Sequence, residues 1–155
     1  MSLAAGAGLL VKTGKPQEEA MDTTDTKTTS VSKVANVIIP VDDQDGMLAF
    51  YTEKLGLEKR ADVPFGDDEG NRWIEVAPSG AETPIALCPP GPSGKAGGKD
   101  TGITLQTDDI DAFHAQLRDR GVDVDPEVSR MGDPVPPLFW LRDPEGNTLM
   151  VVEVR

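Results

Sequence analysis

The sequence has few of the residues that disulfides and thiolate or imidazole metal sites require, and it has no long apolar run. It contains one cysteine and one histidine in 155 residues, so no disulfide can form within the chain. No apolar run approaches the roughly 20 residues of a membrane-spanning helix. The N-terminal residues lack the basic region and cleavage site of a signal peptide. We therefore expect a cytoplasmic protein.

Positive charge is also scarce. Lys and Arg number 15 against 27 Asp and Glu, which gives a formal net charge of −12. A surface this acidic repels the phosphates of nucleic acids and of anionic lipids. We therefore expect neither nucleic acid nor a membrane surface as a partner.

Apolar periodicity is absent from the first part of the chain. Residues 12–32 (KTGKPQEEAMDTTDTKTTSVS) are polar and rich in threonine. A segment of this composition buries too little apolar surface to offset the entropy lost on ordering. We predict a disordered tail over residues 1–32 and a single domain over residues 33–155.

The domain contains one pattern twice, at an offset of 66 residues. VIIPVDD (37–43) and ITLQTDD (103–109) each read as a strand that ends in two aspartates, which suit a helix N-cap. A helical pattern follows each strand and stops at a glycine, Gly56 or Gly121. The chain is therefore an internal duplication.

Further strand patterns complete each copy. RWIEVAP and PIALC follow the first helix, and PLFWLRDP and TLMVVEV follow the second. A linker rich in Gly and Pro, residues 89–100, separates modules 33–88 and 101–155. This order predicts an α+β fold of two βαβββ modules, whose sheets share one core or face each other.

Two motifs carry a resemblance to a known group of proteins. The run VIIPVDDQDGMLAFYTEKLGLE, together with RDPEGN before the last strand, resembles the vicinal oxygen chelate superfamily over residues 34–154. That superfamily includes glyoxalase I, extradiol dioxygenases, and the fosfomycin and bleomycin resistance proteins. The resemblance implies curved mixed sheets around a cavity that a second subunit often completes. We therefore expect a homodimer.

In metal-using members of the superfamily, the first and last strands of each module supply one ligand each. By resemblance, these positions fall on Asn36, Ala86, Gly102 and Met150. Divalent metals need carboxylate or imidazole donors, which none of the four offers. We predict a protein without a metal or other cofactor, in which Met150 forms an apolar cavity wall. The one histidine, His114, lies in a helical pattern and is expected to pack.

Strand alternation assigns residues to the cavity, because neighbouring residues face opposite sides of a sheet. The predicted ligand-binding residues are Asn36, Ile38, Trp73, Glu75, Thr104, Gln106, Trp140 and Met150. An apolar wall with few polar groups suits small organic ligands, and indoles suit planar or cationic ones. Both tryptophans are equally compatible with filling the core. Glu75, the candidate catalytic residue, either anchors a cation, acts as a general base or lies exposed at a sheet edge.

A cysteine and a loop are two further features that could bear on function. Cys88 has no evident base to activate it. We therefore expect Cys88 to serve as a hydrophobic residue at the end of a strand and not as a nucleophile. The loop over residues 128–137 (VSRMGDPVPP) could cover the cavity, with Arg130 available to an acidic ligand group. Such loops are also common as plain connections.

Three functions remain open at this point. The favoured one is a metal-independent protein, similar to the bleomycin resistance branch, that binds a small planar or cationic organic molecule. The alternative is a lyase or isomerase of the superfamily, either using Glu75 as a base or holding a metal at positions other than those aligned above. The third is a scaffold for protein interactions. Whether the chain is an enzyme is left undecided by the sequence.

Overall fold

The computed structural model describes residues 27–67, 70–92 and 94–154. Residues 34–155 form one compact unit. Most of the predicted disordered tail, residues 1–26, lies outside the described residues, and residues 27–33 contain no helix or strand. Among the described residues, no helix is long and apolar enough to cross a membrane.

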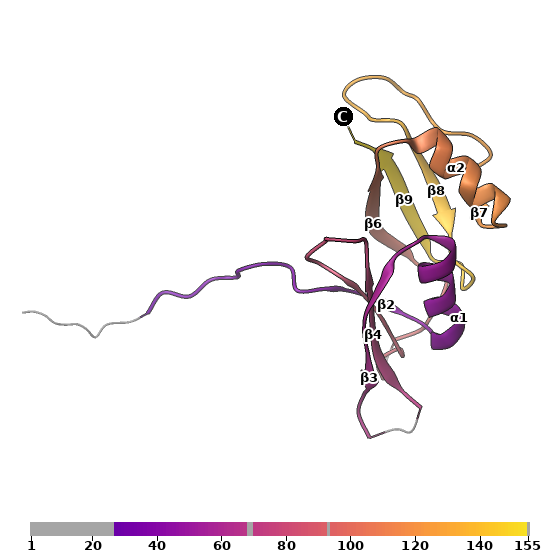
Figure 1. The fold of residues 1–155 in the computed structure, drawn as a ribbon. Helices are drawn as coiled ribbons and strands as arrows, with labels where there is room; N and C mark the ends of the chain where they lie inside the picture. The colour runs from indigo at the N-terminus through magenta and orange to yellow at the C-terminus, as the bar shows by residue number, and fades with distance from the viewer. Residues whose placement is uncertain (1–26, 68–69, 93, 155) are drawn as a thin grey trace, which may run out of the picture. The chain divides into compact units, whose positions relative to one another are not determined.

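The first module forms a four-stranded mixed sheet with one helix on it (Figure 1). Its elements are β2 (Val37–Pro40), α1 (Gln44–Ala49), η2 (Phe50–Lys54), β3 (Glu58–Pro64), β4 (Arg72–Ala77) and β5 (Ile85–Cys88). The strand order is β2-β5-β4-β3, with β2 and β5 parallel and the other pairs antiparallel.

The second module repeats this arrangement. Its elements are β6 (Asp100–Thr107), α2 (Ile110–Asp119), β7 (Asp123–Val124), β8 (Leu138–Arg142) and β9 (Thr148–Glu153). The strand order β6-β9-β8-β7 matches that of the first sheet strand for strand, again with one parallel pair. The predicted α+β fold of two βαβββ modules is confirmed.

The ends of both helices follow the sequence signals. The side chains of Asp43 and Asp109 cap α1 and α2 by accepting hydrogen bonds from backbone N–H groups three residues later. Gly56 and Gly121, with φ of 80° and 78°, turn the chain out of each helix. The π-helical turn η2, which continues α1, was not foreseen from the sequence.

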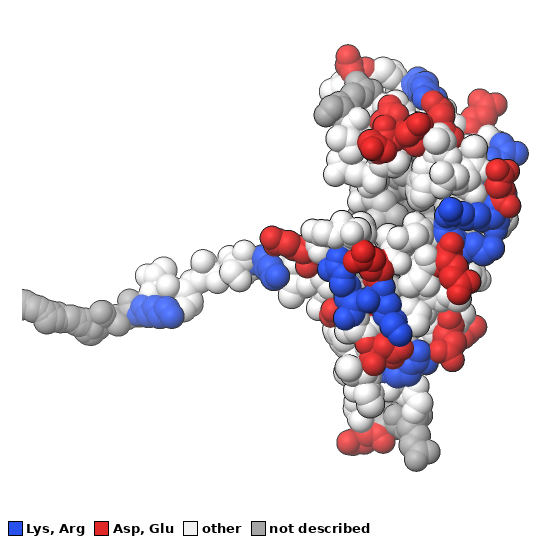
Figure 2. All heavy atoms as spheres, viewed as in Figure 1, with Lys and Arg blue, Asp and Glu red and all other residues white. Residues whose placement is uncertain are grey.

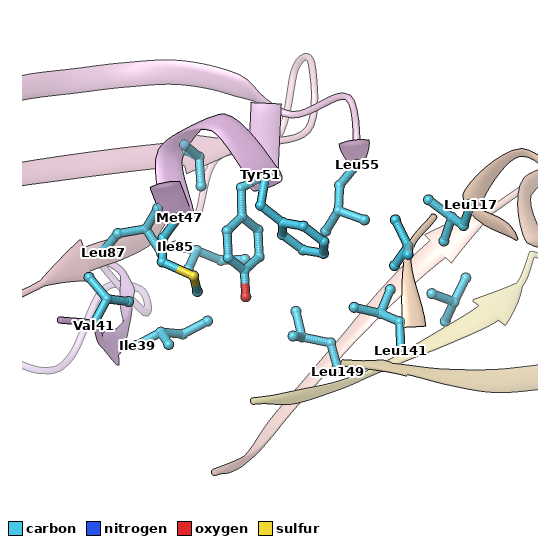
Figure 3. Close-up of a cluster of buried hydrophobic side chains, with 14 of the residues drawn as sticks. Ile39, Val41, Met47, Tyr51, Leu55, Ile85, Leu87, Leu117, Leu141 and Leu149 are labelled. Atoms are coloured by element: carbon cyan, nitrogen blue, oxygen red, sulfur yellow. The ribbon is translucent and has the colours of Figure 1, made fainter. Parts of the chain in front are cut away.

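The two modules share one hydrophobic core on the helix-bearing faces of their sheets (Figure 3). Ile39 and Ile74 of the first sheet and Leu149 and Val151 of the second are at most 1% exposed. Because these residues alternate with half-buried or exposed neighbours, the predicted facing of the three strands β2, β4 and β9 is confirmed.

A tight turn in the second module, residues 143–147, forms hydrogen bonds with the first module. The Tyr51 hydroxyl donates to Asp143 Oδ2 over 2.8 Å, in the buried core. The Glu145 carboxylate accepts hydrogen bonds from the backbone N–H groups of Asp42 and Asp43, just before α1. The linker is fixed at its end as well, since the Gly98 N–H donates to the Glu145 carbonyl oxygen over 3.0 Å. The DPEGN motif is therefore the junction between the modules.

Candidate functional site

Each sheet has a second face, opposite the helix and the core, which we call its open face. On the first sheet, the strand register aligns Ile38, Ala86 and Glu75 in one row across β2, β5 and β4. On the second sheet, the equivalent row is Thr104, Met150 and Trp140 across β6, β9 and β8. Six of the residues singled out by the sequence therefore occupy the central rows of the two open faces.

The open face of the first sheet holds a fixed carboxylate. The Trp73 indole N–H donates to Glu75 Oε2 over 2.8 Å, and both side chains are half-buried. Ala61 and Ala86 flank Glu75 on the neighbouring strands. Because alanine is short, neither of these two neighbours extends beyond Cβ toward the Glu75 side chain. The ring of Phe65 packs against Trp73 with centroids 5.6 Å apart, which extends the apolar surface.

The open face of the second sheet is more apolar in its central row. Trp140 and Met150 are half-buried partners on adjacent strands, and exposed Thr104 lies beyond Met150. Exposed Gln106 pairs with Val152 in the next row. Indole, thioether and hydroxyl groups thus form a surface on which a planar molecule can stack.

A cavity of about 320 Å³ lies beside Trp140. Its lining residues are Asp100, Asp125, Trp140, Arg142 and Thr148. Four of these were missed in the sequence. Arg142 and Thr148 could have been found from strand alternation, since they lie two residues from Trp140 and Met150 and therefore share their face. Asp125 gave no such signal, because it follows a two-residue strand.

The residues predicted to line one pocket fall into two groups. Ile38, Trp73 and Glu75 belong to the first sheet, with half-buried Asn36 just before β2. The other four belong to the second sheet, and the cavity beside Trp140 is lined by second-module residues only. A ligand that touches both tryptophans therefore needs both open faces.

The four residues assigned by resemblance to the metal positions of the superfamily, Asn36, Ala86, Gly102 and Met150, do not fit a metal ion. Ala86 and Met150 occupy equivalent places, since they pair with Ile38 and Thr104, residues 66 apart in sequence. Gly102 lies in an irregularity of β6 with φ of 70°, and it offers no side chain. In the described part of the chain, no group of three His, Cys, Asp or Glu side chains could hold a metal. A methionine, an alanine, a glycine and one asparagine are not a donor set for a hard divalent ion.

His114 packs as expected. It is buried, its Nε2 donates to the Asp125 carbonyl oxygen over 2.7 Å, and its ring meets Phe139 edge-on with centroids 4.8 Å apart. Cys88 is buried as well, and burial raises the pKa of its thiol, which argues against a nucleophile. Arg130 forms an exposed ion pair with Asp111 over 2.8 Å.

The acidic character of the chain is spread over its surface. Figure 2 shows Asp and Glu side chains beside Lys and Arg on the face in view, over both modules. Arg72, for example, pairs with Asp45 and Asp62 at 2.7 and 2.9 Å. Among the described residues, five cations form ion pairs with carboxylates of the chain: Lys59, Arg60, Arg72, Arg130 and Arg142.

Comparison with known proteins identifies the family. The model of the Glyoxalase/Bleomycin resistance protein/Dioxygenase superfamily matches residues 33–151. The chain belongs to this superfamily. A curated relative, the uncharacterized protein YetH of Bacillus subtilis, is 28% identical over 123 residues, which cover 79% of this chain and 99% of YetH.

Solved structures of the superfamily share the fold. TnmS3, an antibiotic binding protein from Streptomyces sp. CB03234, is 34% identical with a TM-score of 0.70, and the match covers 83% of this chain and 100% of TnmS3. A superfamily member from Sphaerobacter thermophilus is 35% identical with a TM-score of 0.69, covering 80% of this chain and 98% of that one.

Proposed function

We propose that this superfamily member binds a small planar or cationic organic molecule, without a metal ion, between open sheet faces that come together in a homodimer. The observation that carries the proposal is the pair of central rows. Where the superfamily can place metal ligands, this chain has Ala86 beside Glu75 and Met150 beside Trp140. The rows thus offer stacking surface and one anchoring carboxylate in place of metal donors.

The function of one structural neighbour supports binding as the activity. TnmS3 is described as an antibiotic binding protein, and its structure aligns over its whole length with this chain. Antibiotics are small organic molecules. This likeness therefore supports small organic molecules as the ligand class of the present chain.

Exposed apolar side chains support the homodimer. Ile38 on the edge strand β2 and Val63 on the opposite edge strand β3 are both 51% exposed on the open face of the first sheet, and Phe65, which packs against Trp73, the strand partner of Val63, is 43% exposed. Side chains of this size are usually covered in a soluble protein when they are contiguous. In a two-fold dimer, a second copy covers them and places both kinds of open face around one ligand.

The dimer is tested by sedimentation velocity. The parent protein is expected at twice the mass of one chain. Val63→Glu places a charge on the covered surface and should shift the protein toward monomer, whereas Glu53→Gln on the exposed side of η2 should not. A parent protein that is monomeric at micromolar concentration would refute this part of the proposal.

Binding is tested by thermal shift on protein treated with a chelator. The panel contains planar cations (proflavine, ethidium), a neutral planar compound (acridone) and an anion (anthracene-9-carboxylate). A ligand at 100 times its dissociation constant adds about 2.7 kcal/mol to the stability of the native state. Trp140→Ala should remove the shift and keep the fold. No hit in this panel and its close analogues would contradict the proposal.

One observation favours an enzyme as the second candidate. The hydrogen bond from Trp73 holds the Glu75 carboxylate in place, as a general base in a lyase or isomerase requires. Chemical conversion of a bound hit is therefore monitored by mass spectrometry in the parent and in Glu75→Gln. Turnover that is lost in Glu75→Gln while binding persists would establish the enzyme.

A further inference from the structure

The cavity beside Trp140 is small but continuous with the stacking surface. Its volume of about 320 Å³ is at the lower limit of pockets that hold drug-sized molecules, roughly 300–1,000 Å³. Asp100, Thr148 and Arg142 form one row across β6, β9 and β8, two residues from the row of Met150 and Trp140. Both rows therefore lie on the same face, and the cavity fits one functional group of a molecule that stacks on Trp140.

The arginine in this cavity is already neutralised. Arg142 Nη1 donates to Asp125 Oδ1 and Arg142 Nη2 donates to Asp123 Oδ1, both over 2.9 Å. The second Asp125 oxygen accepts the backbone N–H of Trp140 over 3.0 Å. The lining itself contains one cation, Arg142, and two carboxylates, Asp125 and Asp100, which give a net charge of −1, and Asp123 lies outside the lining. The cavity therefore attracts a cation in spite of its arginine.

Two groups in the cavity retain binding capacity. Asp100 Oδ1 accepts the Gly102 N–H over 3.2 Å, and among the described residues Asp100 Oδ2 has no hydrogen-bond partner. The indole N–H of Trp140 likewise has no acceptor in the described part of the chain, in contrast to that of Trp73. Asp100 and Trp140 line the same cavity, so a free carboxylate oxygen and an indole ring offer a negative charge and a π face to a bound ammonium.

We propose that this cavity binds the cationic group of the ligand, an ammonium or amidinium attached to a planar ring. Asp100 serves as the counter-ion, the Trp140 ring provides a cation–π contact, and Thr148 offers its hydroxyl. The proposal rests on the proposed function, because the ring that carries the cation lies on Trp140 and Met150. It assigns ligand specificity to Asp100 and narrows the ligand class to planar cations.

The test uses three probes of one shape and different charge: 1-naphthylmethylammonium, 1-naphthylmethanol and 1-naphthoate. The probes are added to the parent protein, whose two tryptophans lie on the two open faces. Quenching of its fluorescence, checked by calorimetry, gives the three affinities. We expect the ammonium to bind about tenfold more tightly than the alcohol, since a cation–π contact and an exposed ion pair add together. The anion should bind most weakly.

Asp100→Asn identifies the counter-ion. An asparagine oxygen can still accept the Gly102 N–H, so the fold is retained while the charge is lost. We expect the affinity for the ammonium to fall to about that for the alcohol, and the affinity for the alcohol to stay unchanged. Asp119→Asn, an exposed residue of α2, makes the same charge change away from the cavity and should keep the preference.

The outcomes separate this proposal from the one on which it rests. If the alcohol binds and the ammonium gains nothing over it, or if Asp100→Asn keeps the preference, the cationic subsite is wrong and planar binding stands. If none of the three probes binds and the thermal-shift panel is empty, both proposals fail together.

Discussion

The two sheets share one topology but carry different side chains on their open faces. The central row of the first sheet is Ile38, Ala86 and Glu75, with a carboxylate between short side chains. The equivalent row of the second sheet is Thr104, Met150 and Trp140, with an indole beside a thioether. The core-facing residues of both sheets stayed apolar. Burial constrains the core face of a duplicated module, and the open face is where the two copies became chemically different.

The largest expected effect is the difference in stability between a core-face variant and an open-face variant on the same strand. Leu149 is fully buried and its neighbour Met150 is half-buried on the opposite side of β9. Leu149→Ala should lower the free energy of unfolding by about 2–5 kcal/mol. Met150→Ala should cost less than about 1.5 kcal/mol, because the open face has room to relax. Urea denaturation of both variants decides it, and equal losses would contradict the division into two faces.

The junction between the modules gives the next largest effect. Tyr51→Phe removes the donor to the buried Asp143 carboxylate, so we expect a loss of about 1–2 kcal/mol in the free energy of unfolding. The control is Thr52→Val on the same turn, which removes a hydroxyl that hydrogen-bonds only to carbonyl oxygens of the preceding helical turn. It should cost less than Tyr51→Phe.

The same tyrosine predicts a dependence on pH. Burial, followed by the charge of Asp143, raises the pKa of the Tyr51 phenol. The native state therefore favours the neutral phenol, and its contribution is fully present below the unfolded pKa of about 10 and lost as pH rises above it. Between about pH 9 and pH 11, the parent should lose more stability than Tyr51→Phe. If the free energies of unfolding of the parent and of Tyr51→Phe fall equally over this pH range, the phenol is not buried in solution.

A smaller effect is expected at Glu75. Glu75→Gln should change the free energy of unfolding by less than about 0.5 kcal/mol, since the side chain is half-buried on an open face. It should weaken binding of proflavine by about threefold to tenfold and leave acridone nearly unchanged, because it removes one ionic contact. Calorimetry with both ligands measures the difference. An equal loss for both would mean that Glu75 shapes the first sheet and does not recognise charge.

Much of the fold could be predicted from the sequence because its signals are local. The 66-residue offset, the aspartate caps at Asp43 and Asp109 and the glycines that end the helices each depend on a few neighbouring residues. Strand alternation likewise placed Trp73 and Trp140 on open faces before the sheets were known. The π-helical turn η2 carries no comparable signal.

The site was harder to predict from the sequence because it depends on contacts between residues that are distant along the chain. Asp143 meets Tyr51 across 92 residues, and Asp125 reaches the cavity from a loop after a two-residue strand. The sequence also placed both tryptophans around one cavity, whereas one chain distributes them over two sheets. Register within a sheet follows from alternation, but the meeting of two sheets depends on packing that alternation does not encode.

The proposed function depends most directly on ligand binding in the absence of a metal ion. The measurement is the affinity of the tightest thermal-shift hit, determined by calorimetry after EDTA treatment and again after addition of Zn²⁺, Ni²⁺ or Mn²⁺. Because Asn36, Ala86, Gly102 and Met150 offer no adequate donor set, we predict the same affinity in all four samples. An affinity that falls about tenfold or more after EDTA and returns with one of these metals would contradict the account.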